Sequence, residues 1–180
     1  LMTTSEHLDW HKDTEEYIDA KRNILKFQNK NDFAIVNLDY PASNESDVYT
    51  NGKVFYVSRE RGVDLGCFVR NGKIILRTLG RLGSSVGQKS RVSEVEIIST
   101  KDILLPGKHN WENVCAAVMA ASNAGVSKES IVKVLKTFKG LEHRLELVRT
   151  VHGVKYYDDS FSTTPETAIA AIQAFKSPEI

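Results

Sequence analysis

Hydrophobic residues recur along this chain with two different spacings, which predict alternating helices and strands. Helical spacing predicts helices over 14–28, 110–124 and 127–138, and a further helix that begins near 164. Short apolar runs between polar clusters predict strands over 33–39, 54–57, 67–70, 73–76, 92–98, 145–148 and 154–157. Residues 41–52 are polar and are expected to form a loop. Strands and helices that alternate in this order favour an α/β fold.

Several residues at the predicted boundaries suit turns and helix caps. Asn71-Gly72 provides both left-handed positions of a type I′ turn, which predicts a hairpin. Asn110 is an expected N-cap, and Thr163 or Thr164 is expected to cap the last helix. Glu166 stands three residues past Thr163, as in a capping box. The last helix is expected to bury an apolar stripe made of Ala168, Ile169, Ala171, Ile172 and Phe175.

The composition is that of an ordinary globular protein. The 180 residues are 41% hydrophobic and 26% charged, with a net charge of +1, which suffices for one good core or two modest ones. This balance gives no electrostatic case for a nucleic-acid partner. Residues 67–91 hold six Lys or Arg and no acid, and we interpret them as a solvated accessory hairpin. Within this stretch, 83–87 lacks the Gly-Lys-Ser/Thr of a phosphate-binding loop.

The cysteines and the apolar runs bear on the cellular compartment. Cys67 and Cys115 lie far apart within apolar runs, so we interpret them as buried thiols of a reducing compartment. No run approaches the ~20 apolar residues of a membrane span, and residues 1–30 are too polar for a signal peptide. We therefore expect a cytoplasmic protein with no membrane partner. The abrupt ends of the chain suggest a piece of something longer.

The first candidate site comprises His7, Asp9 and His11. In a helix the two imidazoles would share one face, and in an irregular loop Asp9 and His7 could still converge on one cation. A solvated loop anchored by Trp10 explains the same spacing. Lys21 follows among apolar residues of the first predicted helix, where a surface lysine is the simplest interpretation.

Polar residues at two predicted element ends form the next candidates. Asn37 and Asp39 end the first predicted strand, at the edge where open α/β sheets bind ligands. An ordinary exit from strand to loop explains them at least as well. Asn110 and Asn113 are three residues apart, so both amides can point to one side of a helix start. Capping explains Asn110 but leaves Asn113 unexplained.

The stretch 140–166 concentrates charged and hydroxyl side chains. A glycine joint delivers Arg144 beside a histidine, and two short strands then end in a paired acid that includes Asp159, followed by Ser160 and Thr163. A fixed cation, carboxylates, and hydroxyls with free N–H groups at a helix start suit an anion site. Helix capping by the acid and the hydroxyls is the competing interpretation.

Pieces of these candidates, taken in order, resemble the Mur ligase family. They are the His-x-Asp stretch followed by the helix with Lys21, Gly-x-His-Asn-x-x-Asn from Gly107, His143-Arg144, and Asp-Ser-x-x-Thr from Asp159. The Gly-Leu-x-His-Arg-x-Glu form at 140–146 is most similar to the members that add D-glutamate. Phe161 stands where many of those members have Lys, and Thr164 stands where they have Asn.

The resemblance implies a magnesium-assisted reaction. His7 would bind one Mg²⁺, and Lys21, once carbamylated, would act catalytically by holding a second Mg²⁺. A carbamate is a hard oxygen ligand of the kind that Mg²⁺ prefers. Ser160 and Thr163 would lie near the substrate.

The resemblance also implies a nucleotide site. Asn110 and Asn113 would contact the adenine of ATP. Arg144 would clamp the nucleotide when two domains close, and Asp159 would hold the ribose side.

An organisation and an activity follow from the same resemblance. Residues 1–139 would be the later part of a central ATP-binding domain, of P-loop-like α/β fold with an accessory β-hairpin. Residues 140–180 would begin a Rossmann-like C-terminal domain that binds the amino acid. The full-length enzyme would use ATP to join D-glutamate to UDP-N-acetylmuramoyl-L-alanine through an acyl phosphate, in peptidoglycan precursor synthesis and cell wall biogenesis. The phosphate loop would lie upstream of Leu1, so this piece alone would be inactive.

Two other functions stay open at this point. One is a sibling ligase, either another Mur ligase or a folylpolyglutamate synthase, against which His143 before Arg144 argues. The other is a non-catalytic module that binds nucleotides or a partner protein. The sequence does not determine the oligomeric state, and a monomer is the expectation for the full-length chain.

Overall fold

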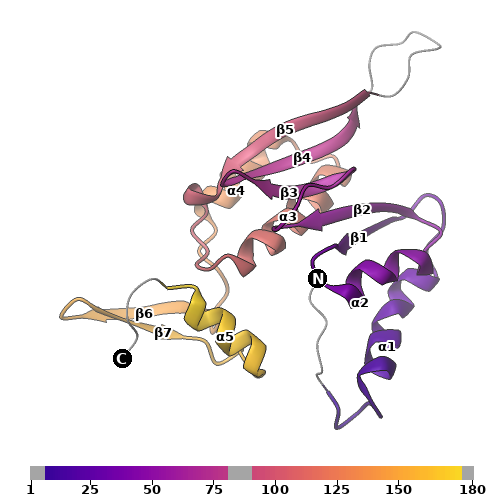
Figure 1. Ribbon diagram of the computed structural model, residues 1–180. Coiled ribbons are helices and arrows are strands. Elements are labelled where there is room, and N and C mark those ends of the chain that lie inside the picture. Colours follow the sequence, from indigo (N-terminus) through magenta and orange to yellow (C-terminus); the bar gives the residue numbers. More distant parts are fainter. Residues whose placement is uncertain (1–6, 81–90, 176–180) are drawn as a thin grey trace.

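The computed structural model describes residues 7–80 and 91–175, and a mixed five-stranded sheet forms its centre (Figure 1). The strands are β1 (Phe33–Asn37), β2 (Lys53–Ser58), β3 (Gly66–Arg70), β4 (Lys73–Gly80) and β5 (Arg91–Ser99). They lie in chain order in the sheet. Strands β1, β2 and β3 are parallel to one another, β4 pairs antiparallel with β3, and β5 pairs antiparallel with β4. The mixed α/β fold predicted from the sequence is confirmed. The prediction for 83–87 lies outside the described residues.

One face of the sheet carries the main hydrophobic core. Helix α3 (His109–Asn123) packs across β1 to β4, and α4 (Lys128–Thr137) lies beside it against β5. Alanines in α3 allow a close approach to the sheet, because they add little side-chain bulk. Cys67 on β3 and Cys115 on α3 are fully buried free thiols in this core, as predicted.

The β3–β4 hairpin has the predicted turn and a neutralised basic face. Asn71 and Gly72 have φ values of 51° and 69°, both in the left-handed region that a type I′ turn requires. Arg70 and Arg77, from the stretch without acids, both pair with Glu94 on β5. An acid on the next strand thus balances two basic residues of the described part of this stretch, and the prediction of an accessory hairpin is wrong because β3 and β4 belong to the central sheet and its core.

The segment from Pro41 to Tyr49 corrects the loop predicted there. It forms a short helix, α2 (Pro41–Asn44), and a 3₁₀ helix (Glu45–Tyr49). Pro41 sits at the start of α2, where its fixed φ suits a helix and its missing N–H costs nothing. The Ser46 hydroxyl donates to the Ala42 carbonyl at 2.6 Å. Polar composition did not exclude helical turns, and Ser43 and Ser46 are buried within them.

Helix α1 (Thr14–Lys26) packs on this segment rather than on the sheet. Arg22 on α1 donates to the Ser46 and Tyr49 hydroxyls, at 3.3 and 3.4 Å. Asp13 caps the helix by accepting from the Glu16 N–H.

Among the described residues, no helix is both long and apolar enough to cross a membrane.

The chain ends in a second, smaller unit made of a hairpin and a helix. Strands β6 (Glu146–Val151) and β7 (Val154–Asp158) form a two-stranded antiparallel sheet, and α5 (Pro165–Gln173) follows. The buried stripe predicted for the last helix is wrong, because Ile169 and Ile172 are 52% and 58% exposed. Just past the helix, the Phe175 ring packs on the Tyr157 ring of the hairpin, with centroids 4.5 Å apart. A two-stranded sheet covers only part of a helix face.

The start of α5 confirms Thr164, one of the two predicted caps, and corrects the predicted capping box. Thr164 is the N-cap, and its hydroxyl pairs reciprocally with Thr167 in a capping box. The box is therefore not formed by Thr163 and Glu166. Pro165 occupies the first helical position, which places the third position at Thr167 rather than at Glu166.

Candidate functional site

An open cleft of about 790 Å³ lies between the start of α3 and the segment that carries the β6–β7 hairpin and α5. Four of the sequence-predicted site residues line this cleft, although they come from distant parts of the chain. They are Asn110, Asn113, Arg144 and Asp159. The structure therefore brings together the residues expected to surround a nucleotide.

Asn110 shapes the entrance to α3 but is not its N-cap, which corrects the sequence prediction. Lys108 is the N-cap, because the chain turns at Gly107 (φ 85°) and enters the helix earlier than predicted. The Asn110 side-chain amide donates to the Pro106 carbonyl at 2.7 Å. Asn110 thus ties the turn to the first helical residues.

Asn113 is held by Asn110 and faces the same cleft. Its amide nitrogen donates to the Asn110 side-chain oxygen at 3.2 Å. That contact uses one amide hydrogen and leaves the second hydrogen and the amide oxygen available to a ligand. A donor beside an acceptor matches the amino group and neighbouring ring nitrogen of adenine. The prediction that both amides point to one side of the helix start is confirmed.

Arg144 and Asp159 are brought together by a loop in an unusual conformation. His143 and Leu145 on either side of Arg144 have φ values of 62° and 45°. The Leu145 N–H donates to the Asp159 carboxylate at 3.0 Å, and the Phe161 N–H donates to the His143 carbonyl at 3.1 Å. The Arg144 guanidinium lies over the Phe161 ring, 5.9 Å from its centroid. These contacts fix both charged groups at the cleft.

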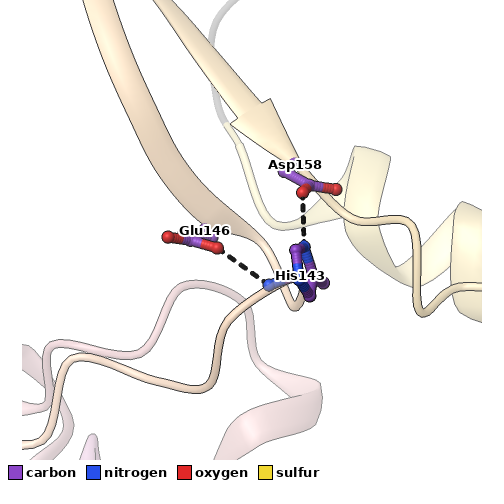
Figure 2. A group of neighbouring side chains, drawn as sticks. All are labelled: His143, Glu146 and Asp158. Atoms are coloured by element: carbon purple, nitrogen blue, oxygen red, sulfur yellow. Dashed lines mark hydrogen bonds and ion pairs between the residues drawn. The ribbon is translucent and has the colours of Figure 1, made fainter.

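A charged clasp on the outside of this loop is shown in Figure 2. The His143 Nδ1 lies 2.7 Å from an Asp158 carboxylate oxygen, and the His143 N–H donates to Glu146 at 2.8 Å. The histidine lowers the pKa of Asp158 to about 2, and the carboxylate raises the pKa of His143. The His143 ring and the Asp158 carboxylate pair with each other, and this contact joins the loop that carries Arg144 to the end of β7.

The opposite wall of the cleft contains a buried acid that sequence reasoning missed. Glu112 on α3 is only 4% exposed, and it accepts a hydrogen bond from the Tyr40 hydroxyl at 2.9 Å. The Arg59 Nε lies 3.7 Å from the same carboxylate. Burial is the main reason that the pKa of Glu112 is raised. Burial and then Glu112 raise the pKa of Tyr40 to about 12.

His109 stands between the two walls. Its pKa is lowered, first by burial and then by the positive charges of Arg59 and Arg144. The imidazole is therefore predominantly neutral near pH 7. The same interactions show that the two guanidinium groups lie within electrostatic reach of one side chain, although they come from opposite walls.

Asn37 and Asp39 shape the wall from behind rather than lining the cleft. The Asp39 carboxylate accepts from the Ser58 hydroxyl at 2.6 Å and from the Arg59 N–H at 2.8 Å. Asn37 is fully buried, and its side-chain oxygen accepts from the Asp39 N–H. These contacts favour the interpretation as a strand exit, and they set the position of Arg59 at the carboxyl end of β2.

His7 and Lys21 do not line the cleft, and they lie near each other around the ring of Tyr17. The His7 and His11 rings are 5.8 and 5.4 Å from the Tyr17 ring, and the Lys21 Nζ is 5.2 Å from it. His7 lies in a turn (φ 56°), and both His7 and Asp9 are exposed. An imidazole and an amine on one aromatic ring suit a metal only if the amine becomes an oxygen ligand, because an ammonium group cannot coordinate.

Ser160 and Thr163 are exposed and are not part of the cleft wall. The Ser160 N–H donates to the Asp158 carboxylate at 2.9 Å, which is a local turn contact. Ser162 and Thr167, from the same segment, line the cleft instead. The Ser162 hydroxyl donates to the Asp159 carboxylate and helps to orient it.

Comparison with known proteins gives a family match and a set of close relatives. The model of the Mur ligase middle domain matches residues 2–121. The UDP-N-acetylmuramoylalanine--D-glutamate ligase of Clostridium novyi (strain NT) is 39% identical over 174 residues, which are 97% of this chain and 34% of the relative. That of Thermoanaerobacter sp. (strain X514) is 37% identical over 178 residues, 99% of this chain and 37% of the relative. The chain thus spans about a third of the length of these relatives.

Solved structures show the same fold at lower identity. A MurF structure from Acinetobacter baumannii has a TM-score of 0.68 at 22% identity, covering 96% of this chain and 35% of that chain. A pseudomurein peptide ligase type C from Methanothermus fervidus has a TM-score of 0.65 at 16% identity, covering 97% of this chain and 40% of that chain.

Proposed function

The chain belongs to the Mur ligase family, and from this premise we propose that the full-length protein is an ATP-dependent ligase that joins D-glutamate to UDP-N-acetylmuramoyl-L-alanine. The observation that carries the proposal is the 37–39% identity to D-glutamate ligases over nearly the whole chain. The solved structures are at most 22% identical and support the fold alone, so they do not favour another acceptor.

We propose that the cleft binds the nucleoside part of ATP. Asn113 offers a donor and an acceptor to adenine, while Asn110 acts by holding Asn113 in place. Arg144 and Asp159 are fixed on the facing wall, so they can hold the sugar and the phosphate side. Planar guanidinium and amide groups at fixed positions recognise a ligand at low entropic cost.

In the proposed reaction, a substrate carboxylate oxygen attacks the γ-phosphorus of ATP, and ADP leaves. The resulting acyl phosphate is then attacked by the amine of D-glutamate, which loses a proton, and phosphate leaves as the amide bond forms. Arg144 contributes by holding the nucleotide in place as two lobes close, since positioning supplies much of the catalysis in phosphoryl transfer. Gly140 (φ 108°) precedes this loop and is the proposed hinge.

We propose that His7 and carbamylated Lys21 hold Mg²⁺, and that Ser160 and Thr163 lie near the substrate when the full chain is assembled. His7 would hold one ion and carbamylated Lys21 the second, and the two ions would neutralise negative charge on the phosphates. Both His7 and Lys21 are grouped at Tyr17, which supports a common role. We also propose a domain boundary at 139/140, a monomeric full-length enzyme, and action in the cytoplasm.

The experiment that tests the proposal is an acceptor panel with the full-length protein. ATP, Mg²⁺ and UDP-N-acetylmuramoyl-L-alanine are supplied with D-glutamate, L-glutamate, L-lysine, meso-diaminopimelate or D-alanyl-D-alanine, and both phosphate and amide product are measured. We expect turnover with D-glutamate at least about a hundredfold above every other acceptor. Equal or better turnover with another acceptor would move the protein to a sibling ligase. Nucleotide binding without turnover for any acceptor would favour a non-catalytic module.

A further inference from the structure

Arg59 is a charged residue of the cleft wall with no role in the proposed function so far. It directly follows β2, at the carboxyl end of a parallel strand, and its side chain lines the cleft. Its backbone N–H is fixed by Asp39 at 2.8 Å. The residue is therefore anchored at the sheet edge where α/β folds bind ligands.

The guanidinium of Arg59 is held from one side. Its Nε donates to Glu60 at 2.8 Å and lies 3.7 Å from the buried carboxylate of Glu112. The Tyr40 hydroxyl holds the other side of Glu112. Among the described residues, neither terminal nitrogen of the Arg59 guanidinium has a hydrogen-bond partner.

Burying Glu112 is costly unless its partners compensate. A carboxylate with 6% side-chain exposure pays a desolvation penalty that only good partners can offset. Two of its partners, the Tyr40 hydroxyl and the Arg59 guanidinium, belong to residues that line the cleft, and the buried Asn37 side chain also favours the charged form. The arrangement fixes the plane of the Arg59 guanidinium while leaving its outer edge open.

Two observations favour the nucleoside rather than the phosphates as the group that Arg59 contacts. Glu112, which holds Arg59, is the chain neighbour of Asn113, the proposed adenine reader on α3. Arg59 and Arg144 both line the cleft, as does His109, and both positive charges lower the pKa of His109. A planar cation can stack on a purine face or donate to its ring nitrogens.

We infer that Arg59 is a further nucleoside-binding residue, which contacts the purine from the wall opposite Arg144, and that Glu112 and Tyr40 are its positioning residues. The inference rests on the proposed nucleotide cleft. It adds Arg59 as a binding residue on the wall that faces Arg144. Neither the family motifs nor the sequence pattern pointed to Arg59.

The test measures binding of adenosine and of ADP to the full-length protein without Mg²⁺, by calorimetry or saturation-transfer NMR. Arg59→Ala is compared with Arg61→Ala, a matched control in the same loop whose guanidinium donates to the Leu38 carbonyl and which does not line the cleft. We expect Arg59→Ala to weaken both ligands at least about tenfold, and Arg61→Ala to leave both unchanged. Arg59→Lys should restore little, because an ammonium lacks the planar fork.

Positioning by Glu112 is tested with Glu112→Gln, which keeps an acceptor for Tyr40 and removes the charge. We expect a smaller loss of adenosine affinity than in Arg59→Ala, with an unchanged melting temperature. Equal affinities of Arg59→Ala and Arg61→Ala for adenosine and ADP would overturn the inference. Binding of both ligands by the wild type would in that case still support the proposed function. A loss for ADP with none for adenosine would also overturn it, by placing Arg59 at the phosphates. No binding by the wild type would instead refute the nucleotide cleft itself.

Discussion

The pair formed by His143 and Asp158 makes the loop that carries Arg144 sensitive to pH. The raised pKa of His143 means that its stabilising effect is full below its unfolded pKa of ~6.5 and is lost as pH rises through the folded pKa. The lowered pKa of Asp158, about 2, means that its effect is present above ~3.9 and is lost as pH falls through that folded pKa. The clasp is therefore strongest between about pH 4 and 6.5.

We expect Asp158→Asn to bring the pKa of His143 down towards ~6.5, because the carboxylate is the main cause of the raised pKa. The measurement is an NMR titration of the His143 ring. Glu146→Gln is the control, since Glu146 contacts the His143 backbone N–H and affects the ring less. An unchanged His143 titration in Asp158→Asn would mean that the clasp does not form in solution.

The two asparagines of α3 should separate into a reader and a holder. We expect Asn113→Ala to weaken ADP binding at least about tenfold, since a bidentate amide contact contributes about 1–3 kcal/mol. Its melting temperature should stay unchanged, because Asn113 is exposed. Asn110→Ala should weaken binding and also lower the melting temperature, because the Pro106 carbonyl loses its donor. Wild-type ADP affinity in Asn113→Ala would remove the residue from the adenine site.

Local sequence patterns predicted most elements, and the failures have separate physical causes. The β3–β4 turn and the hairpin at β6–β7 were predictable because their signals lie within a few residues. The buried stripe of α5 was not, because burial depends on which other elements cover the helix. The cap of α3 was missed because Gly107 turns the chain earlier than side-chain preference alone indicates.

At the scale of an element, the junction of β2 and β3 depends on a glycine. Gly66 has φ 143°, and a Cβ there would lie 1.8 Å from the Tyr56 carbonyl oxygen. We expect Gly66→Ala to cost about 3 kcal/mol or more in urea unfolding, because neighbouring backbone would have to move. Gly153→Ala is the matched control, with φ 84° and open space around it, and should cost only about 1 kcal/mol. Equal losses for the two variants would contradict the close β2–β3 approach.

For the whole molecule, the sequence indicated the residues proposed to bind the nucleotide, but not the residues of the cleft wall that faces Arg144. Asn110, Asn113, Arg144 and Asp159 belong to recognisable motifs, and the fold brings them together. Tyr40, Arg59 and Glu112 come from separate segments that meet only in the folded chain, so no local pattern connects them. Spacing also could not show that Ser162 rather than Ser160 lines the cleft.

Lys21 lies outside the cleft, which separates its proposed role from nucleotide recognition. In the full-length protein, if it has the proposed ligase activity, we expect Lys21→Ala to abolish turnover while ADP affinity without Mg²⁺ stays at the wild-type value. Lys26→Ala, on the same helix, is the matched control and should retain turnover. Added bicarbonate or small acids should not restore turnover unless they replace the carbamate. Normal turnover in Lys21→Ala would end the assignment of this lysine.

The central claim is that one cleft, formed where α3 begins and bounded by Arg144 and Asp159, receives the nucleoside of ATP. The most direct measurement is a crystal structure of the full-length protein with ADP and Mg²⁺. We expect adenine within hydrogen-bonding distance of Asn113 and the ribose beside Asp159. A nucleotide bound elsewhere, with these side chains still facing solvent, would contradict it.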